Sequence, residues 1–329
     1  MKLAILGVAH VHAKGYAQIC KQLGDVEVAR VYDRDAEAAR LVADVCDAQP
    51  TQDVSACLGP EIDAVLICSE NIYHSTLVRL AAAAGKHILC EKPLATSAQE
   101  AKEMVAVCKE AGVQLQTAFP CRYHPTITRT REVLAEGVLG DILAVRASNH
   151  GQMPGGWFAS QALAGGGAIM DHTVHVVDLL RYLLDDEFAS VYALSAHRFH
   201  DIEVEDAGLL SLHMQKGVMV TLDPSWSRPA SNPTWGDVTM EFVGTNGTLS
   251  VDVFAQVVEW YRTAVPTYQW APYGADMDAL MLADFIERVR AQQTVRVTGV
   301  DGLRATEVVM AAYASVASGT VQPVLQETL

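Results

Sequence analysis

The sequence predicts an α/β protein, with a doubly wound parallel sheet over residues 1–120 and an α+β fold with a mostly antiparallel sheet over residues 121–329. In the first range, apolar strand-like runs alternate with amphipathic helix-like stretches, as in a parallel sheet flanked by helices. In the second range, the pattern changes to alternating polar and apolar residues with turn dipeptides. The length of 329 residues also favours two domains, because domains contain about 150 residues.

Five apolar runs in the first domain are expected to be strands. They are Leu3–Val8, Val26–Tyr32, Ala64–Cys68, His87–Cys90 and Val113–Phe119. Runs of Val, Ile, Leu and Ala are typical of strands that are buried on both faces of a parallel sheet. The expected helices between them are Ala36–Val45, His74–Ala84 and Ser97–Ala111. Ser97 and Glu100 have the pattern of a capping box, and Gly112 follows the last turn as a left-handed cap.

The second domain combines helices with strands. Its expected elements are a helix at Arg122–Gly137, a strand at Ile142–Ser148, a glycine-rich loop, a helix at Ala168–Leu184, several strands over Val191–Val258, and closing helices at about Asp276–Gln292 and Gly302–Ser318. The dipeptide Asn246-Gly247 stands between two strand-like segments and indicates a hairpin.

Composition and charge disfavour several kinds of partner. Half of the residues are hydrophobic, which is typical of a globular protein. The formal net charge of −15 disfavours nucleic acid and anionic membrane surfaces, since both attract basic faces. The seven cysteines form no C-x-x-C pair, so we expect free thiols and a reducing, cytoplasmic location. We also expect no signal peptide and no membrane span.

The turn after the first strand, Gly7-Val8-Ala9-His10-Val11-His12, partly matches the dinucleotide-binding pattern G-x-G-x-x-G. Gly7 fits the first position, whereas Ala9 and His12 replace the second and third glycines. Asp33 ends the second expected strand, where a carboxylate can bind the hydroxyls of an adenosine ribose. These residues favour a dinucleotide site, and the alternative is an ordinary strand–helix turn.

Lys92 follows the fourth expected strand, in the segment Cys90-Glu91-Lys92-Pro93-Leu94. Ligands of open α/β sheets bind at the carboxyl ends of the parallel strands. This lysine could therefore hydrogen-bond a substrate hydroxyl or carbonyl, and the alternative is a solvated loop lysine.

A further candidate site lies on the helix after the glycine-rich loop. Asp171 and His175 are four residues apart and share a helix face, and Asp178 falls near it. A carboxylate raises the basicity of a neighbouring imidazole, so His175 is a candidate general base oriented by its own helix. The alternatives are a structural histidine and a metal site that includes His172. Because His172 points roughly 100° away from Asp171 on the helix, we expect no metal.

Taken together, these segments resemble the glucose–fructose oxidoreductase / inositol dehydrogenase (Gfo/Idh/MocA) family over essentially the whole chain. The most specific similarities are Glu91-Lys92-Pro93 after the fourth strand and the glycine-rich run into Asp171-x-x-x-His175. The segment Cys121–Pro125 resembles the family segment that opens the second domain. Gly244–Leu249 resembles the family's hairpin, and Gly299–Ala305 resembles the start of its closing helix.

The resemblance implies a Rossmann domain that binds NAD or NADP, followed by a domain with a large open sheet. With the turn described above, the expected cofactor-binding residues are Gly7, Ala9, His10, Val11, His12, Asp33, Arg34, Ser69, Asn71, His74, Glu91 and Lys92. The expected catalytic residues are Lys92, Asp171 and His175, and the expected substrate-binding residues are Arg122, Tyr123, His150 and Trp157, with Trp226 as a further candidate. Departures from the family pattern are Ala9, His12, Glu70, Cys121 and Thr173. Asp33 favours NAD over NADP, because a carboxylate repels the 2′-phosphate.

We therefore expect an oxidoreductase that transfers a hydride between nicotinamide and a secondary alcohol or ketone of a sugar, an inositol-like polyol or a related compound. His175 would accept the hydroxyl proton, and Lys92 would stabilise the alkoxide. The alternatives are an NAD-dependent glycosidase that uses transient oxidation and a non-catalytic regulator that senses the dinucleotide. We expect a homo-oligomer, a dimer or a tetramer, that forms through the open sheet.

Overall fold

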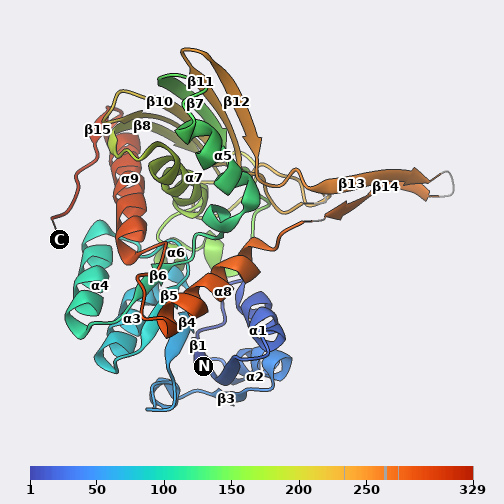
Figure 1. Cartoon of the computed structure of the whole chain (residues 1–329), viewed down its shortest axis with the longest axis vertical. Helices are drawn as coiled ribbons and strands as arrows, with labels where there is room; N and C mark the ends of the chain where they lie inside the picture. The colour runs from blue at the N-terminus through green and yellow to red at the C-terminus, as the bar shows by residue number, and fades with distance from the viewer. Residues whose placement is uncertain (233, 263–264, 273, 329) are drawn as a thin grey trace.

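A computed structural model of the chain describes residues 1–232, 234–262, 265–272 and 274–328. Its elements surround two main sheets (Figure 1). The N-terminal elements, with η for a 3₁₀ helix, are β1 (Lys2–Leu6), α1 (Ala13–Gln22), β2 (Glu27–Tyr32), α2 (Ala36–Cys46), β3 (Gln49–Thr51), η1 (Val54–Cys57), β4 (Ala64–Ile67), η2 (Asn71–Tyr73), α3 (His74–Ala83), β5 (His87–Cys90), α4 (Ala98–Ala111) and β6 (Leu115–Thr117). The C-terminal elements are η3 (Pro120–Tyr123), α5 (Pro125–Ala135), β7 (Ile142–Ser148), η4 (Gly156–Ala159), α6 (Gln161–Ala164), α7 (Ala168–Leu184), β8 (Phe188–Ala196), β9 (Ala207–Met214), β10 (Met219–Asp223), β11 (Thr239–Gly244), β12 (Gly247–Asp252), β13 (Val257–Arg262), β14 (Val265–Pro272), α8 (Met277–Arg290), α9 (Gly299–Ser318) and β15 (Gln322–Pro323).

The N-terminal half is a doubly wound parallel sheet, which confirms the predicted fold class. Its strand order is β3-β2-β1-β4-β5-β6, and all of these pairs run parallel. The order reverses between β1 and β4, and ligands bind in such sheets at the carboxyl ends beside this point. The strand β3 was not expected, because its three residues, Gln49-Pro50-Thr51, carry no apolar signal.

Gly7 makes the turn between β1 and α1 possible. Its φ is +78°, and a Cβ atom there would lie 2.5 Å from the Cβ of Ser69. The N–H of Gly7 donates to the carbonyl oxygen of Tyr32 at 2.8 Å. Glycine therefore permits both the left-handed backbone and the close approach of this turn to the segment after β4.

The C-terminal half contains a seven-stranded mixed sheet in the order β12-β11-β7-β10-β9-β8-β15. The pair β7–β10 runs parallel, and the other neighbouring strands of this sheet run antiparallel, as the sequence predicts. In the hairpin of β11 and β12, Gly244 pairs with Gly247, so the two turn residues are Thr245 and Asn246. The expected hairpin is confirmed, but its turn lies one residue earlier because β12 already begins at Gly247.

Two helix starts differ from the predicted ones for local reasons. Pro125 stands in the first turn of α5 and forces extended backbone at His124, so the expected helix from Arg122 is split into η3 and α5. The last long helix, α9, begins three residues before the expected start. Thr298 and Asp301 form a complete capping box there, which fixes the helix start.

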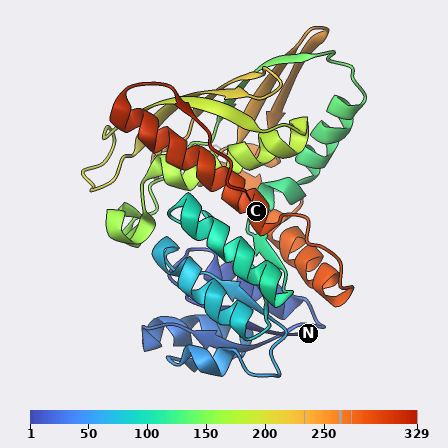
Figure 2. The ribbon, with the colours of Figure 1, turned by 90° about the vertical axis from the view of Figure 1, so that its left-hand side faces the viewer.

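Helices α5, α7 and α9 cover one face of the seven-stranded sheet, and the opposite face is open (Figure 2). The closing helices also contact the N-terminal half, because α9 packs against α4 and α8 packs against α1. The hairpin of β13 and β14 projects away from the rest of the chain (Figure 1). Among the described residues, none of the helices combines the length and the apolar character needed to cross a membrane.

Candidate active site

A cavity of about 340 Å³ lies where the turn after β1 and the carboxyl end of β5 meet the beginning of α7. Its polar lining includes His10, His12, Lys92, Asp171, His175 and Asp278. Its walls include the rings of Phe158, Trp235 and Phe254. The three predicted catalytic residues therefore share one cavity at the edge of the sheet where ligands bind in this fold.

Lys92 and Asp171 form a buried ion pair in this cavity, with side chains that are 4% and 5% exposed. Lys92 Nζ donates to Asp171 Oδ1, and Trp226 Nε1 donates to Asp171 Oδ2 at 3.2 Å. Burial opposes ionisation of Asp171, but Lys92 and His172 outweigh it and hold its pKa well below the ordinary value. The carboxylate thus pairs with the Lys92 ammonium and fixes its direction. The peptide bond between Lys92 and Pro93 is cis.

His175 faces the same cavity from α7. Its Nδ1 atom is buried and has no hydrogen-bond partner among the described residues, and its ring lies edge-on to Phe119. The expected orientation of His175 by Asp171 is not found, because the Asp171 carboxylate contacts Lys92 and Trp226 instead. Burial and the Lys92 charge lower the pKa of His175 well below its ordinary value. The imidazole is therefore neutral at physiological pH and able to accept a proton.

His172 lies closer to Asp171 than the helical wheel indicates. Its Nε2 atom is 3.2 Å from Asp171 Oδ2, and its Nδ1 atom donates to the carbonyl oxygen of Pro224 at 3.1 Å. The side chain of His172 is fully buried. The helical wheel gives only the directions of the Cβ atoms. The side chains of two consecutive residues can still meet through their rotamers, as these two do.

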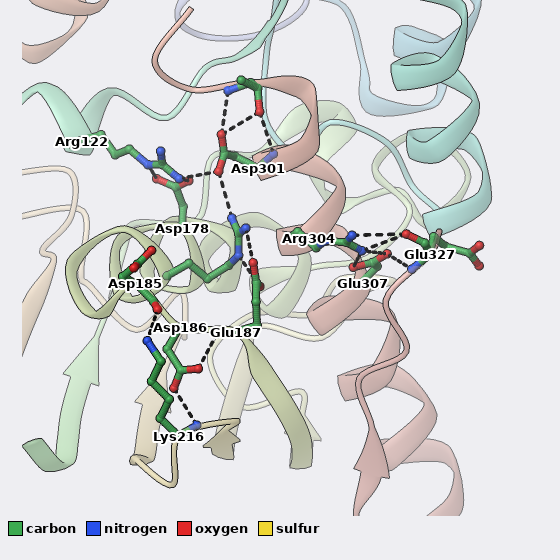
Figure 3. Close-up of polar contacts among 12 residues, drawn as sticks. Arg122, Asp178, Asp185, Asp186, Glu187, Lys216, Asp301, Arg304, Glu307 and Glu327 are labelled. Atoms are coloured by element: carbon green, nitrogen blue, oxygen red, sulfur yellow. Dashed lines mark hydrogen bonds and ion pairs between the residues drawn. The ribbon is translucent and has the colours of Figure 1, made fainter. Parts of the chain in front are cut away.

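Arg122 and Asp178 belong to a separate ion-pair network (Figure 3). Arg122 donates from Nε and Nη2 to the two carboxylate oxygens of Asp178 at 2.8 and 2.6 Å, and from Nη2 to Asp301 at 2.9 Å. Arg122, which was expected to bind substrate, instead connects η3 to α7 and α9. Asp178 is occupied by this arginine, so it does not orient His175 either.

Tyr123 and Trp157, also expected to bind substrate, do not line the cavity. The Tyr123 hydroxyl donates to Asp284 at 3.4 Å. Trp157 stacks on Phe158 with ring centroids 3.9 Å apart, and its Nε1 donates to the carbonyl oxygen of Ala9 at 3.0 Å. Trp157 therefore supports a cavity wall and the turn after β1 rather than contacting the cavity itself.

His150, the fourth expected substrate-binding residue, connects strand ends. Its Nδ1 lies 2.9 Å from Asp237 and its Nε2 lies 3.1 Å from Asp223. Hydrogen bonds to Asp223 and Asp237 raise the pKa of His150 to about 9. These contacts join the residues after β7, at the end of β10 and before β11, beside the cavity rather than in it.

The beginning of α1 lacks a side-chain cap. His12 is the N-cap residue and its side chain makes no cap hydrogen bond, whereas its own N–H donates to His10 Nδ1 at 3.3 Å and the Ala13 N–H donates to the carbonyl oxygen of His10 at 3.1 Å. Val11, at the tip of the turn, is 59% exposed. Uncapped N–H groups at a helix N-terminus bind the diphosphate of a dinucleotide. The residues at this turn therefore fit such a cofactor, even with Ala9 in place of the second glycine.

Asp33 and Arg34 lie at the end of β2. Asp33 Oδ2 accepts a hydrogen bond from the Val8 N–H at 2.8 Å, which holds the carboxylate beside the turn. Arg34 donates to Glu70 at 2.9 Å, and its guanidinium carbon lies 3.8 Å from the centroid of the Tyr73 ring. Glu70 replaces a proline of the family pattern, and its carboxylate forms an ion pair with Arg34.

The turn after β4 is fixed by Asn71 and His74. Asn71 Nδ2 donates to the carbonyl oxygen of Ala164 at 2.8 Å and ties the turn to α6. The fully buried His74 donates from Nδ1 to the carbonyl oxygen of Pro93 at 3.0 Å, and its Nε2 lies 3.3 Å from the carbonyl oxygen of Ser69. His74 thus connects the turns after β4 and β5.

His10, His12 and Glu91 meet beside the cavity. The Nδ1 atoms of His12 and His10 lie 3.0 and 3.6 Å from Glu91 Oε1. Burial lowers the pKa of His10 to about 3. Burial disfavours the charged form of His12 as well, but Glu91 outweighs it and raises the pKa of His12. For Glu91, the two imidazoles outweigh burial and lower its pKa.

The structure adds polar cavity residues that the sequence analysis did not single out. They are Asn149, Asp237 and Asp278. Asp278 Oδ1 is buried without a hydrogen-bond partner among the described residues, and burial with the nearby Glu91 raises its pKa to about 6. The sequence contains a hint of two of them. Asn149 directly follows an expected strand. Asp278 stands two residues after Asp276, whose carboxylate already caps α8, so the Asp278 carboxylate is not needed as a cap.

Both halves of the chain match known protein families. Residues 1–119 match the family described as "Oxidoreductase family, NAD-binding Rossmann fold", and residues 127–250 match the "GFO/IDH/MocA C-terminal domain". Inositol 2-dehydrogenase of Cereibacter sphaeroides is 30% identical over 83% of this chain and 78% of its own length. The 1,5-anhydro-D-fructose reductase of Ensifer adhaerens is 35% identical over 58% of this chain and 57% of its own length, so that match spans little more than half of either protein.

Solved structures share the fold over the whole chain. The crystal structure of GenD2 from gentamicin A biosynthesis, in complex with NAD, has a TM-score of 0.91 at 25% identity and covers 99% of this chain and 97% of that one. Levoglucosan dehydrogenase in complex with NADH and levoglucosan has a TM-score of 0.86 at 21% identity, with 99% and 100% coverage. From the two family matches and these relatives, we conclude that the chain belongs to the Gfo/Idh/MocA family of NAD-binding oxidoreductases.

Proposed function

We propose that this protein oxidises a secondary alcohol of a sugar or polyol with NAD as the hydride acceptor, or reduces the corresponding ketone. The observation that carries this proposal is the cavity that Lys92, Asp171 and His175 share beside the dinucleotide-binding turn. It contains a charged hydrogen-bond donor and a neutral proton acceptor, which are the two groups that alcohol oxidation requires of the protein.

Lys92 and His175 divide the proton chemistry. The neutral imidazole of His175 accepts the hydroxyl proton, while the ammonium of Lys92 donates a hydrogen bond to the oxygen as its negative charge develops. The C–H bond of the same carbon breaks as the carbonyl forms, and bound NAD supplies the hydride acceptor. Asp171 lines the cavity as well, and its role in this proposal is to position Lys92, with which it pairs. In the reductive direction, His175 returns the proton.

The preference for NAD over NADP is supported by charges at the end of β2. The Asp33 carboxylate stands where the adenosine ribose binds in Rossmann domains and repels a 2′-phosphate. Arg34 is the residue that could offset this repulsion, but it is paired with Glu70 and packed on Tyr73. We expect a lower Kd for NAD than for NADP.

A polyhydroxylated ring fits the lining of the cavity. Phe158, Trp235 and Phe254 offer apolar surfaces for the C–H groups of such a ring. Asn149 and Asp278 each have a buried carboxamide or carboxylate oxygen without a hydrogen-bond partner among the described residues, and hydroxyl groups would satisfy them. The relatives named inositol 2-dehydrogenase and levoglucosan dehydrogenase support the same substrate class.

Two further features of the proposal concern assembly and location. The open face of the seven-stranded sheet carries the cross-strand pair Leu194 and Leu209, which are 54% and 59% exposed. A depression of about 900 Å³ lies on this face, and a second copy that covers it would form a homodimer, or part of a tetramer. The seven cysteines are all free and buried, which supports a reducing, cytoplasmic location.

The proposed function can be tested with purified protein and NAD⁺. Inositols, alkyl glucosides and anhydrosugars are offered as substrates, and NADH is followed by its absorbance. We expect NADH formation with at least one of them and little formation with NADP⁺. Substrate cleavage without accumulating NADH would instead indicate a glycosidase that uses transient oxidation. Tight NAD binding without turnover of any substrate would indicate a sensor.

A further inference from the structure

We propose that His10, His12 and Glu91 bind one divalent transition-metal ion, such as Zn²⁺, at the edge of the cavity. One ligand atom from each of these residues lies within 4.8 Å of the other two. The sequence analysis expected no metal, and the metal site that it weighed was the one with His172 on the helix. The fold supplies the third ligand from the end of β5, 79 residues after His12.

The distances within the cluster fit such an ion. The Nδ1 atoms of His12 and His10 lie 3.0 and 3.6 Å from Glu91 Oε1. Ligand atoms at about 2.0–2.1 Å from a tetrahedral zinc ion are roughly 3.4 Å apart. The two distances to Glu91 are therefore within a few tenths of an ångström of this spacing, and the ligand atoms of His10 and His12 lie within 4.8 Å of each other. Two imidazoles and one carboxylate are also a ligand set that catalytic zinc and non-haem iron centres use.

Burial gives the cluster a reason to bind a cation. The side chain of Glu91 is 0% exposed and that of His10 is 1% exposed, so a charged carboxylate lies out of contact with water. A buried carboxylate is costly unless a positive charge compensates it. The ammonium of Lys92, the next residue, is committed to Asp171. The His12 ring, 3.0 Å from Glu91 Oε1, supplies this charge when it is protonated. A bound dication would take over that role and would displace the hydrogen bond between His12 and Glu91.

One neighbouring group holds Glu91 in place. Glu91 Oε2 accepts a hydrogen bond from the Lys92 N–H at 3.1 Å, which leaves Oε1 for the ion. Hydrogen bonds that orient a ligand commonly change metal affinity by about 10–100-fold. At the two imidazoles the ion would displace existing contacts, since the Tyr16 hydroxyl lies 3.5 Å from His12 Nδ1 and the His12 N–H donates to His10 Nδ1 at 3.3 Å.

The fourth position of the ion would face the cavity. His10 and His12 both line it, together with Asp278, whose buried Oδ1 has no partner among the described residues. An ion with three protein ligands and one open position binds an oxygen atom there, from water, a carboxylate or a ligand in the cavity. This geometry is that of a reactive rather than a purely structural metal site.

The proposal is tested by metal binding, with no need for turnover. Protein is stripped with a chelator and titrated with Co²⁺ and Zn²⁺, and the visible bands of Co²⁺ report nitrogen and oxygen coordination. We expect one ion per chain, with Zn²⁺ displacing Co²⁺. Failure to bind one equivalent, or Co²⁺ bands of the hexa-aqua ion only, would overturn the proposal. Either result is independent of whether the protein oxidises sugars.

Variants locate the site on these residues. His12→Ala, which removes a partly exposed ligand, and Glu91→Gln, which removes the buried carboxylate, should each weaken Zn²⁺ binding by at least about 100-fold, more than the loss of a surrounding contact. His150→Gln is the matched control, because it removes a histidine that also contacts carboxylates but lies outside the cluster. Unchanged affinity in His12→Ala, or an equal loss in His150→Gln, would contradict the assignment. Since His12→Ala removes no fully buried group, the test does not depend on the folding of the Glu91 variant.

Discussion

Lys92 and His175 have complementary roles in a shared environment. The buried Asp171 carboxylate directs the Lys92 ammonium, and burial together with the Lys92 charge lowers the pKa of His175. A hydrogen-bond donor and a neutral proton acceptor therefore face one cavity. The direction of the lysine and the low pKa of the histidine both depend on the other residues of the site.

The ion pair of Lys92 and Asp171 makes a prediction about stability as well as activity. Lys92→Ala leaves a buried carboxylate without its partner, so we expect a loss of about 3–5 kcal/mol in the free energy of unfolding, measured by urea denaturation. We also expect kcat to fall by about 10²–10³. The double variant Lys92→Met/Asp171→Asn should recover most of the stability but not kcat. If Lys92→Ala keeps the free energy of unfolding and the kcat of the wild type, the ion pair contributes neither to stability nor to catalysis.

The low pKa of His175 predicts the acid side of the pH profile. A general base must be unprotonated, and an ordinary histidine is half protonated near pH 6.5. Because the pKa of His175 lies well below that value, kcat/KM for oxidation should stay nearly constant from pH 8 to about pH 6. Asp278→Asn serves as the control, since the pKa of Asp278 is about 6. A decline centred near pH 6.5 that persists in this control would contradict the neutral-base assignment.

At this scale, the sequence predicted the residues of the cavity better than their partners. The family resemblance, together with the helical spacing of Asp171 and His175, was enough to place Lys92, Asp171 and His175 in one expected site. Spacing along one helix does not show which side chains arrive from other elements, so the pairing of Asp178 with Arg122 and that of Asp171 with Lys92 could not be derived. For the same reason, four residues expected to bind substrate were placed by the fold outside the cavity lining.

Among the elements, three strand ends are held together by one imidazolium. His150 follows β7 and contacts Asp223 at the end of β10 and Asp237 before β11. These contacts fix the loop that brings Trp235 and Asp237 to the cavity. The charge of one histidine thus contributes to the shape of a cavity that its side chain does not line.

This contact makes stability depend on pH in a defined direction. The pKa of His150 is raised from 6.5 to about 9, so its contribution is fully present below pH 6.5 and is lost as the pH rises through 9. The side chain is 28% exposed, and solvent screening therefore reduces the effect. We expect the free energy of unfolding to fall by about 1–2 kcal/mol between pH 6.5 and 9. The free energies of unfolding of the wild type and His150→Gln, measured by denaturation, should converge over this range. A constant difference between them would contradict the raised pKa.

Most elements were predictable because their signals are local. Buried strands such as β1 and β4 have continuous apolar residues, and α7 was predicted at its observed bounds. The differences arise where a short polar strand, β3, pairs only because β2 offers a free edge, and where Pro125 divides an otherwise helical pattern. The boundary between the two domains near residue 120 stays a prediction.

For the whole molecule, the open face of the seven-stranded sheet predicts the state of assembly. Its exposed pair, Leu194 and Leu209, would be buried in a dimer that forms through this face. We expect a dimer or tetramer by light scattering at micromolar concentration, and smaller species for Leu209→Glu. Lys102→Glu, on α4 of the other half, should leave the mass unchanged. A monomeric wild type would contradict the proposed interface.

The most direct test of the central claim is the rate of the first turnover in His175→Ala. Protein with bound NAD⁺ is mixed rapidly with the alcohol identified as a substrate, NADH formation is followed, and the Kd for NAD⁺ is measured separately. If His175 is the general base beside the cofactor, the rate should fall by about 10²–10⁴ while the Kd changes less than about twofold. A first turnover as fast as that of the wild type would contradict the account, because the cavity would then lack the proton acceptor assigned to it.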